Sequence, residues 1–328
     1  MIISASRRTD IPHYYGDWFF RRLKEGFLWV RNPLNPKQVS RISLSPAAVD
    51  CIVFWTKDPE PVMGRLEELR DYDYYFQFTL TGYGREVEPG LPDKETVLLP
   101  AFRRLAKQIG SDRTVWRYDP ILFSDTYTAE WHLDTFGRFA DALQGYTKRC
   151  VISFADLYVG NRKGMAAIGA AGIRGIVPQA AATASVSKGW TAENIGPFAS
   201  RLKAAADRNG MELVTCAEQA DLSEWGIEHG SCIDPKLIEQ ITGFRMKGKK
   251  DPGQRPECGC MQSIDVGAYH TCPCGCVYCY AGGGGAAAER NFRQHRPDSP
   301  LLCGRPGPED EVRERGMPSL KEYQMSLF

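Results

Sequence analysis

The chain has 328 residues, with 41 lysines and arginines against 40 aspartates and glutamates, so its formal net charge is +1. Its 43% hydrophobic and 25% charged residues are typical of globular proteins and exclude a fibrous or largely disordered chain, and the balanced charge provides no overall attraction to nucleic acid or membrane. No apolar run approaches the ~18 residues of a membrane span, and the charged start MIISASRRTD is unlike a signal peptide, so we expect a cytoplasmic protein with no membrane partner.

Short β-rich apolar runs alternate with amphipathic segments along the chain. The expected strands are residues 2–6, 50–55, 74–80, 114–118, 150–154 and 212–216. The expected helices are residues 17–25, 59–69, 100–108, 128–143 and 191–209. Such alternation favours βαβ units, and the pattern predicts an α/β fold built as a six- to seven-stranded (βα) partial barrel of the TIM type.

Each expected strand ends in polar or charged residues, which predicts a common polar mouth. In parallel α/β folds, ligands bind at the carboxyl ends of the strands. Three such strand-end residues, Arg117, Asp119 and Glu218, are therefore candidate catalytic groups that bind a polar substrate or transfer a proton. The alternative for Arg117 and Asp119 is a structural salt bridge at the end of a strand.

Eleven cysteines are the most informative feature, because six of them lie between residues 258 and 279. In a long cytosolic chain such a cluster indicates a metal rather than disulfides. Cys272, Cys276 and Cys279 have the spacing C-x3-C-x2-C, which suits three irons of a [4Fe-4S] cluster and leaves the fourth iron open. A zinc site completed by Cys274 and His270 is the alternative.

A second set of cysteines lies in and before this cluster. Its members are Cys216, Cys232, Cys258 and Cys260. Four thiolates would close a second iron–sulfur cluster or a zinc site, whereas free buried cysteines are the other interpretation. Cys51 and Cys150 lie inside apolar runs, and we expect them in the core.

The C-x3-C-x2-C segment resembles the signature of radical S-adenosylmethionine (radical SAM) enzymes. Tyr278, just before the third cysteine, matches the aromatic residue that in this family lies against the cofactor. The resemblance implies a [4Fe-4S] cluster, S-adenosyl-L-methionine and a reductant such as flavodoxin or ferredoxin. Nearly the whole chain also resembles the DUF1848 family, through residues 4–12, 117–120, 216–218 and 230–234 and the cysteine cluster; this resemblance names no substrate.

The cysteine loop stands near the end of the chain, whereas in typical radical SAM enzymes it follows the first strand. The apolar run 263–267 precedes the loop, so we interpret it as that first strand, moved by circular permutation, with residues 2–6 taking the second strand's place. A Gly-Gly-Glu-like stretch is absent there. Instead, Ser6, Arg7, Arg8 and Asp10 are expected to hold the methionine end of the cofactor, with arginine gripping its carboxylate.

We expect three parts: a barrel over residues 1–256, a cysteine-rich segment over 257–295 that completes it, and a surface tail over 296–328. A basic stretch between Arg245 and Arg255 could contact phosphates. The last residues, Gln324–Phe328, look like the peptide by which bacterial repair proteins bind the sliding clamp. Both features suggest a nucleic-acid substrate.

Together these features predict a radical SAM-type enzyme. It would cleave S-adenosyl-L-methionine reductively to a 5′-deoxyadenosyl radical that acts on an unknown substrate. The alternative is a zinc- or iron–sulfur-binding protein that interacts with nucleic acid or acts as a sensor without this chemistry.

Overall fold

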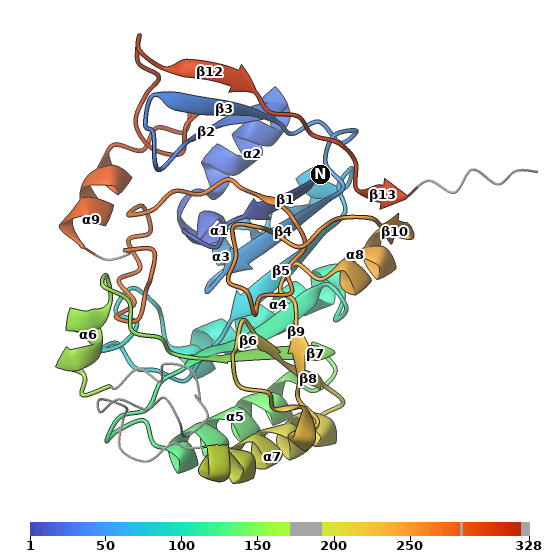
Figure 1. The fold of residues 1–328 in the computed structure, drawn as a ribbon, viewed down its shortest axis with the longest axis vertical. Coiled ribbons are helices and arrows are strands. Elements are labelled where there is room, and N and C mark those ends of the chain that lie inside the picture. Colours follow the sequence, from blue (N-terminus) through green and yellow to red (C-terminus); the bar gives the residue numbers. More distant parts are fainter. Residues whose placement is uncertain (171–191, 283–284, 323–328) are drawn as a thin grey trace, which may run out of the picture.

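The computed structural model describes residues 1–170, 192–282 and 285–322, and its main element is a parallel sheet of eight strands (Figure 1). The strand order is β11-β1-β4-β5-β6-β7-β8-β9, and every neighbouring pair is parallel. These strands are β1 (Ile2–Ala5), β4 (Cys51–Thr56), β5 (Tyr74–Thr79), β6 (Thr114–Ile121), β7 (Arg149–Phe154), β8 (Glu212–Cys216), β9 (Glu228–Gly230) and β11 (Ile264–Asp265). The α/β class and the large parallel sheet are therefore confirmed.

The strand before the cysteine loop pairs with the first strand of the chain, as the sequence predicted. Ile3 lies opposite Ile264, and Ser4 opposite Asp265, in a parallel pair. All six predicted strands are also present. The eighth strand, β9, was missed because its three residues, Glu-His-Gly, show no apolar run and it forms an edge of the sheet.

Nine helices are present in the part of the chain that the structure describes. They are α1 (Ile11–Tyr14), α2 (Gly16–Glu25), α3 (Glu60–Met63), α4 (Leu99–Ile109), α5 (Ala129–Leu143), α6 (Arg162–Ala167), α7 (Ala192–Arg208), α8 (Pro235–Thr242) and α9 (Ala286–Arg293). Shorter turns of helix are η1 (Leu66–Leu69), η2 (Lys94–Leu98) and η4 (Ser223–Trp225). The predicted helix 59–69 is divided into α3 and η1 around Gly64.

Alternating side chains give the sheet an apolar face that packs against helices. The ring of Phe78 in β5 lies 4.9 Å from that of Phe102 in α4, and Trp116 in β6 stacks 4.8 Å from Phe136 in α5. Since successive residues of a strand point to opposite faces, Gln77 and Arg117 point away from these helices. The helices thus leave the other face of the sheet free for polar contacts.

The polar face contacts Cys232 and, through Asp265, the cysteine-rich segment 257–295. Gln77 donates a hydrogen bond of 2.8 Å to the carbonyl of Cys232, and Trp55 Nε1 donates one of 3.1 Å to Ser4 Oγ. Ser4 Oγ in turn donates to Asp265 in β11. The predicted polar strand ends and the cysteine-rich segment therefore meet on one face.

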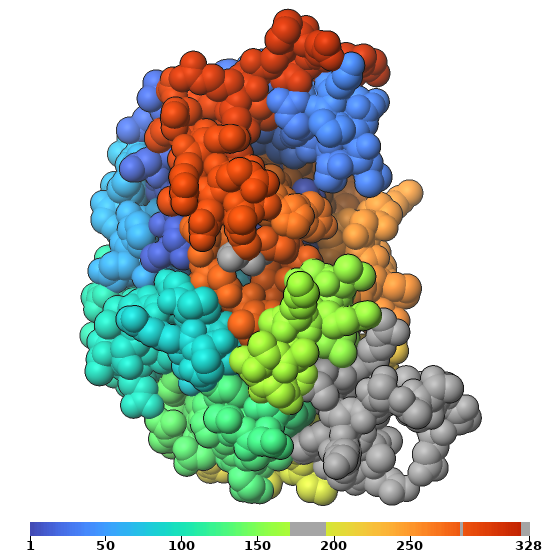
Figure 2. Space-filling view, turned by 90° about the vertical axis from the view of Figure 1, so that its left-hand side faces the viewer, coloured from blue at the N-terminus to red at the C-terminus, as the bar shows by residue number. Residues whose placement is uncertain are grey.

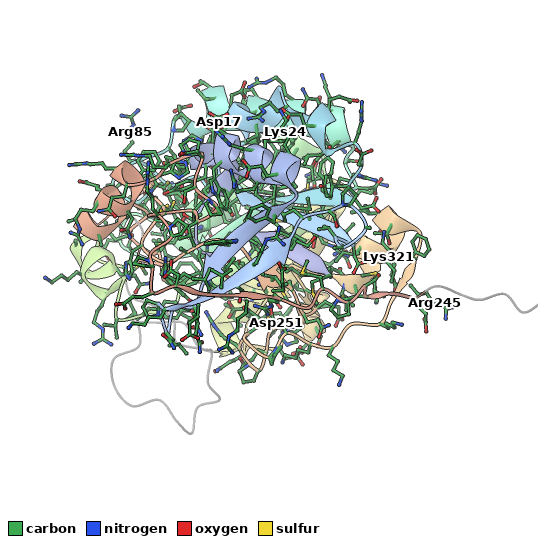
Figure 3. The ribbon with its side chains drawn as sticks, turned by 90° about the horizontal axis from the view of Figure 1, so that it is seen from above. Asp17, Lys24, Arg85, Arg245, Asp251 and Lys321 are labelled. Atoms are coloured by element: carbon green, nitrogen blue, oxygen red, sulfur yellow. The ribbon has the colours of Figure 1, made fainter. Side chains whose placement is uncertain are left out.

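Two small sheets join distant parts of the chain. One has the order β12-β3-β2, with strands β2 (Phe27–Arg31), β3 (Gln38–Ser43) and β12 (Glu311–Glu314). The other pairs β10 (Arg245–Met246) with β13 (Lys321–Glu322), and Figure 3 shows Arg245 and Lys321 at the same end of the molecule. The segment expected as a surface tail thus contributes two strands, and Gln324–Phe328 lies outside the described residues. Within the described ranges, no helix has both the length and the apolar character needed to span a bilayer.

Candidate metal and cofactor site

The cysteine loop, residues 266–282, follows β11 and is held on two sides by backbone contacts. Gly90 N donates to Cys274 O at 2.9 Å, and Val277 N donates to Val87 O at 3.0 Å. On the other side, Asn161 Nδ2 donates to Tyr278 O at 3.0 Å. Figure 2 shows this orange part of the chain at the surface, between the cyan segment that follows β5 and the light green α6.

The three predicted cluster ligands lie on this loop with a fourth cysteine among them. Cys276 and Cys274 are buried, and their sulfurs are 3.5 Å apart, while Cys272 and Cys279 are half-buried. Burial raises the pKa of Cys272 to about 12, although hydrogen bonds from the backbone N–H groups of Asp10 and Cys274 act to lower it. The Cys274 thiol and the Lys57 ammonium lower the pKa of Cys276.

Thiols are the ligands that soft metals prefer. In the described chain, however, these thiols are not arranged around one point where a metal ion could sit. All the cysteines are free. Within the described residues, no three His, Cys, Asp or Glu side chains are placed as ligands of one ion. Metal binding therefore requires the contacting thiols to separate by side-chain rotation. His270 Nδ1 is 3.2 Å from Gly282 O, so its ring is turned to the backbone of the loop.

A buried ionic network that the sequence reasoning missed lies beside the loop. Glu88 is fully buried and contacts Lys57 Nζ at 2.8 Å, Lys94 Nζ, and Thr81 Oγ1 at 3.0 Å. Tyr278 donates its hydroxyl proton to Glu88 and lies 2.6 Å from Lys57 Nζ. The aromatic residue of the predicted cofactor site is therefore fixed by two charged side chains.

The Glu88 carboxylate is ionised in this network. Burial alone would raise its pKa, but Lys57 and Lys94 outweigh burial and lower the pKa of Glu88 to about 2. The Glu88 carboxylate likewise keeps the pKa of Lys57 above its ordinary value despite burial. Lys57 follows the carboxyl end of β4, and a charged residue at that position indicates a possible site residue. Nothing in the sequence indicated that Glu88 belongs to the site.

Asp265 organises three of the residues predicted to bind the cofactor. Its carboxylate accepts hydrogen bonds from Ser6 Oγ at 2.6 Å and from the backbone N–H of Arg7 at 2.8 Å. Arg8 Nε lies 3.7 Å from the same carboxylate, and its guanidinium lies 5.1 Å from the centre of the Tyr269 ring. The Arg8 side chain remains 24% exposed. It is thus a cation held at the start of the cysteine loop.

Asp10 and the Arg7 guanidinium are placed differently from Arg8. Asp10 caps α1 by accepting from His13 N at 3.0 Å, and its other oxygen accepts from Lys57 N at 2.7 Å. Both of its oxygens are therefore used by the backbone. The Arg7 guanidinium points to Asp251, at 3.7 Å, and to the Cys260 thiol.

Of the three predicted catalytic residues, Arg117 and Asp119 lie within β6, which continues to Ile121, and Glu218 follows the end of β8. Arg117 pairs with Asp119 at 2.6 Å and also donates to Cys232 Sγ at 2.6 Å. Glu218 accepts a hydrogen bond of 2.7 Å from Phe154 N, and burial raises its pKa to about 8. Glu218 is therefore a carboxyl group that can hold a proton at neutral pH.

The structure brings together the second set of cysteines. Cys216 Sγ and Cys232 Sγ are 2.8 Å apart. Cys260 Sγ accepts from Ile233 N at 3.3 Å, and Cys258 Sγ accepts from Cys260 N at 3.5 Å. Cys232 contacts Arg117 and Cys260 contacts Arg7, beside the polar face of the sheet.

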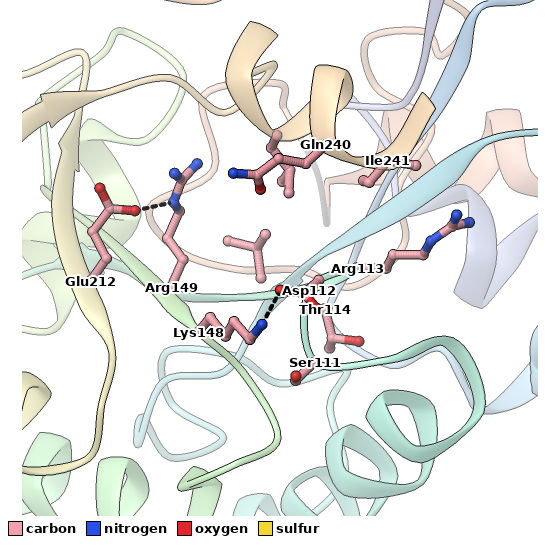
Figure 4. A pocket seen from close by; sticks show the side chains of 11 residues that line it. Ser111, Asp112, Arg113, Thr114, Lys148, Arg149, Glu212, Gln240 and Ile241 are labelled. Atoms are coloured by element: carbon pink, nitrogen blue, oxygen red, sulfur yellow. Dashed lines mark hydrogen bonds and ion pairs between the residues drawn. The ribbon is translucent and has the colours of Figure 1, made fainter. Parts of the chain in front are cut away.

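Two cavities lie at opposite ends of the parallel strands. One, of about 590 Å³, is lined by the amino ends of β6, β7 and β8 and is bordered by the ion pairs Lys148–Asp112 and Arg149–Glu212 (Figure 4). The other, of about 550 Å³, includes Glu88 and Lys94. Since ligands of parallel sheets bind at the carboxyl ends, the second cavity is the better candidate for a substrate.

The basic stretch before the cysteine loop is partly paired. Arg255 forms a 2.5 Å ion pair with Asp156 and also contacts Tyr158. Lys250 donates to the carbonyl of Pro256. These contacts account for two of the cations that the sequence suggested for phosphate binding.

Comparisons with known proteins identify a family but no activity. A family model described as a domain of unknown function, DUF1848, matches residues 2–281. No curated protein matches the chain. A crystal structure of a protein from Bacteroides thetaiotaomicron, proposed to be an alpha-L-fucosidase, is similar with 12% identity and a TM-score of 0.25, over 76% of this chain and 83% of that one. At that score the likeness carries no argument about function.

Proposed function

We propose that this chain, which belongs to the DUF1848 family of domains of unknown function, is a radical SAM-type enzyme with a [4Fe-4S] cluster on Cys272, Cys276 and Cys279. The observation that carries the proposal is the position of their loop. It directly follows β11, which pairs with β1, so the three thiols stand at the carboxyl ends of the strands. This placement supports a circularly permuted partial barrel of the radical SAM type.

The residues around the loop supply what such a site requires. When bound, the cluster and S-adenosyl-L-methionine would supply reductive cleavage of the sulfonium bond and hydrogen-atom abstraction from a substrate. Tyr278 would present its ring to the cofactor, with its hydroxyl fixed by Lys57 and Glu88. Arg8 would grip the methionine carboxylate, and Ser6 would keep Asp265 oriented beside it.

A zinc site is the second candidate, and one observation favours it. Cys274 Sγ lies 3.5 Å from Cys276 Sγ, so a fourth thiol is available to close the site. A closed four-thiolate site would be structural and would leave no open position for a cofactor. The protein would then act as an interaction module or sensor without radical chemistry.

The test is anaerobic reconstitution of the intact chain with iron and sulfide, followed by reduction in the presence of S-adenosyl-L-methionine. The proposal predicts release of 5′-deoxyadenosine, measured by chromatography, and none from a variant with Cys272, Cys276 and Cys279 all replaced by alanine. A brown protein that forms no 5′-deoxyadenosine would instead be an iron–sulfur sensor. About one zinc per chain at this loop, with no iron, would favour the structural site. Flavodoxin or ferredoxin is the expected physiological reductant.

We expect Arg8→Lys to weaken binding of S-adenosyl-L-methionine to the cluster-loaded protein. Lysine keeps the charge but cannot make the two parallel hydrogen bonds of a guanidinium to a carboxylate, so the loss should be roughly tenfold or more in affinity. Equilibrium dialysis with labelled cofactor measures it. Arg293→Lys, on the exposed end of α9, is the matched control and should bind like the unmodified protein. Equal affinities for all three proteins would remove Arg8 from the cofactor site.

The predicted nucleic-acid substrate and sliding-clamp partner depend largely on Gln324–Phe328, which lies outside the described residues.

A further inference from the structure

We infer that Cys216, Cys232, Cys258 and Cys260 form a second, closed four-thiolate metal site, with Arg7 and Arg117 as its counter-charges. This inference is independent of radical chemistry at the first loop. It concerns a different set of thiols, on the polar face of the sheet.

The first argument is convergence from separate parts of the chain. Cys216 ends β8, Cys232 lies between β9 and α8, and Cys258 and Cys260 precede β11. Their contacts form a chain, since Cys216 touches Cys232 at 2.8 Å, and Cys260 hydrogen-bonds with Cys232 and with Cys258. Four thiols from three segments therefore come together in the interior.

The surroundings of Cys232 and Cys260 are charged rather than apolar. Arg117 Nη1 lies 2.6 Å from Cys232 Sγ, and Arg7 contacts Cys260. Both guanidiniums lie over the ring of Trp55, at 5.3 Å for Arg7 and 5.1 Å for Arg117. Ordinary buried thiols pack as small apolar groups and need no cations beside them.

One guanidinium nitrogen of Arg7 lacks a hydrogen-bond acceptor among the described residues. Arg7 Nη2 is buried and has no hydrogen-bond acceptor within the described chain. A buried donor without an acceptor is costly, especially on a charged group. Four thiolates around Zn²⁺, or around a cubane core of charge 2+, leave a net charge of about −2. Two guanidiniums would balance that charge and give Arg7 its acceptor.

For a zinc ion, the closest pair of these thiols needs only a small change in separation, although the four thiols do not surround one point before a metal binds. Sulfurs of a tetrahedral zinc site lie about 3.8 Å apart, given Zn–S bonds of about 2.3 Å. Cys216 and Cys232 would have to separate by roughly 1 Å from their present 2.8 Å contact. A disulfide between these two is the competing use of the pair, but it would leave Cys258, Cys260 and both arginines without a common partner.

The test measures iron, zinc and sulfide per chain in anaerobically purified protein in which Cys272, Cys276 and Cys279 are already alanine. We expect this variant to retain about four irons with sulfide, or about one zinc. Adding Cys232→Ala and Cys260→Ala should remove that metal. Adding Cys150→Ala instead should keep it, because Cys150 is a buried core thiol remote in sequence from both sets.

Iron with sulfide identifies a cluster and zinc alone identifies a zinc site; either result supports the inference. A folded triple variant without metal, or a Cys216–Cys232 disulfide found by mass spectrometry after alkylation, would overturn it. If the triple variant does not fold, Cys232→Ala with Cys260→Ala in the intact chain should lower the metal content while 5′-deoxyadenosine formation reports separately on the first loop. Unchanged metal content there would also overturn the inference.

Discussion

Replacing Cys276 with alanine should abolish both the visible absorbance of the loop's iron–sulfur cluster and the formation of 5′-deoxyadenosine, while Cys274→Ala should preserve both. The two cysteines are neighbours in space, with sulfurs 3.5 Å apart, and both are buried. Only Cys276 belongs to the C-x3-C-x2-C set. A cubane held by three thiolates loses its support when one of them is removed.

The pair of variants separates the two candidate functions of the loop because each variant removes one buried thiol from the same place. If Cys274→Ala loses the metal as completely as Cys276→Ala does, four thiols hold it and the closed site is correct. If neither variant changes the metal content or the product yield, the loop is not the metal site. Circular dichroism of both variants checks that the fold is retained.

The strand pattern could be predicted from the sequence because parallel strands buried between layers form apolar runs that stand out from their surroundings. The pairing of β11 with β1 was expected from the resemblance to radical SAM enzymes, which placed the apolar run before the cysteine loop beside residues 2–6. The edge strand β9 and the short strands β12 and β13 could not be predicted in this way. Their residues are mainly exposed and polar, and the partners of β12 and β13 are distant in sequence.

The candidate site could be predicted only where its residues form a local pattern in the sequence. The cysteine motif and its aromatic neighbour are local patterns, and so are polar strand ends. Glu88 and Asp265 are single carboxylates whose importance arises from partners far along the chain, such as Tyr278 for Glu88 and Ser6 for Asp265. The difference between Arg7 and Arg8 likewise depends on side-chain direction, which adjacent positions in a sequence do not reveal.

We expect Glu88→Gln to destabilise the protein by about 3–5 kcal/mol, because it leaves the half-buried cations of Lys57 and Lys94 without the fully buried carboxylate that they share. Chemical denaturation measures the free energy of unfolding. Glu60→Gln is the matched control, since Glu60 pairs with Arg104 at the surface and should lose less than about 1 kcal/mol. Equal losses for the two variants would contradict the buried network.

The pH dependence of the same pair of proteins gives a second, independent measurement. The pKa of Glu88 is lowered from its ordinary 4.5 to about 2 in the folded protein, so between these values the unfolded chain binds the extra proton. The stabilisation by Glu88 is therefore complete above pH 4.5 and is lost as the pH falls toward 2. The stability difference between the unmodified protein and Glu88→Gln should be constant from about pH 7 to pH 5 and should shrink below that. A difference that does not change with acidification would mean that Glu88 is not ionised beside Lys57, and Tyr278 would then be positioned by hydrogen bonding to a neutral acid.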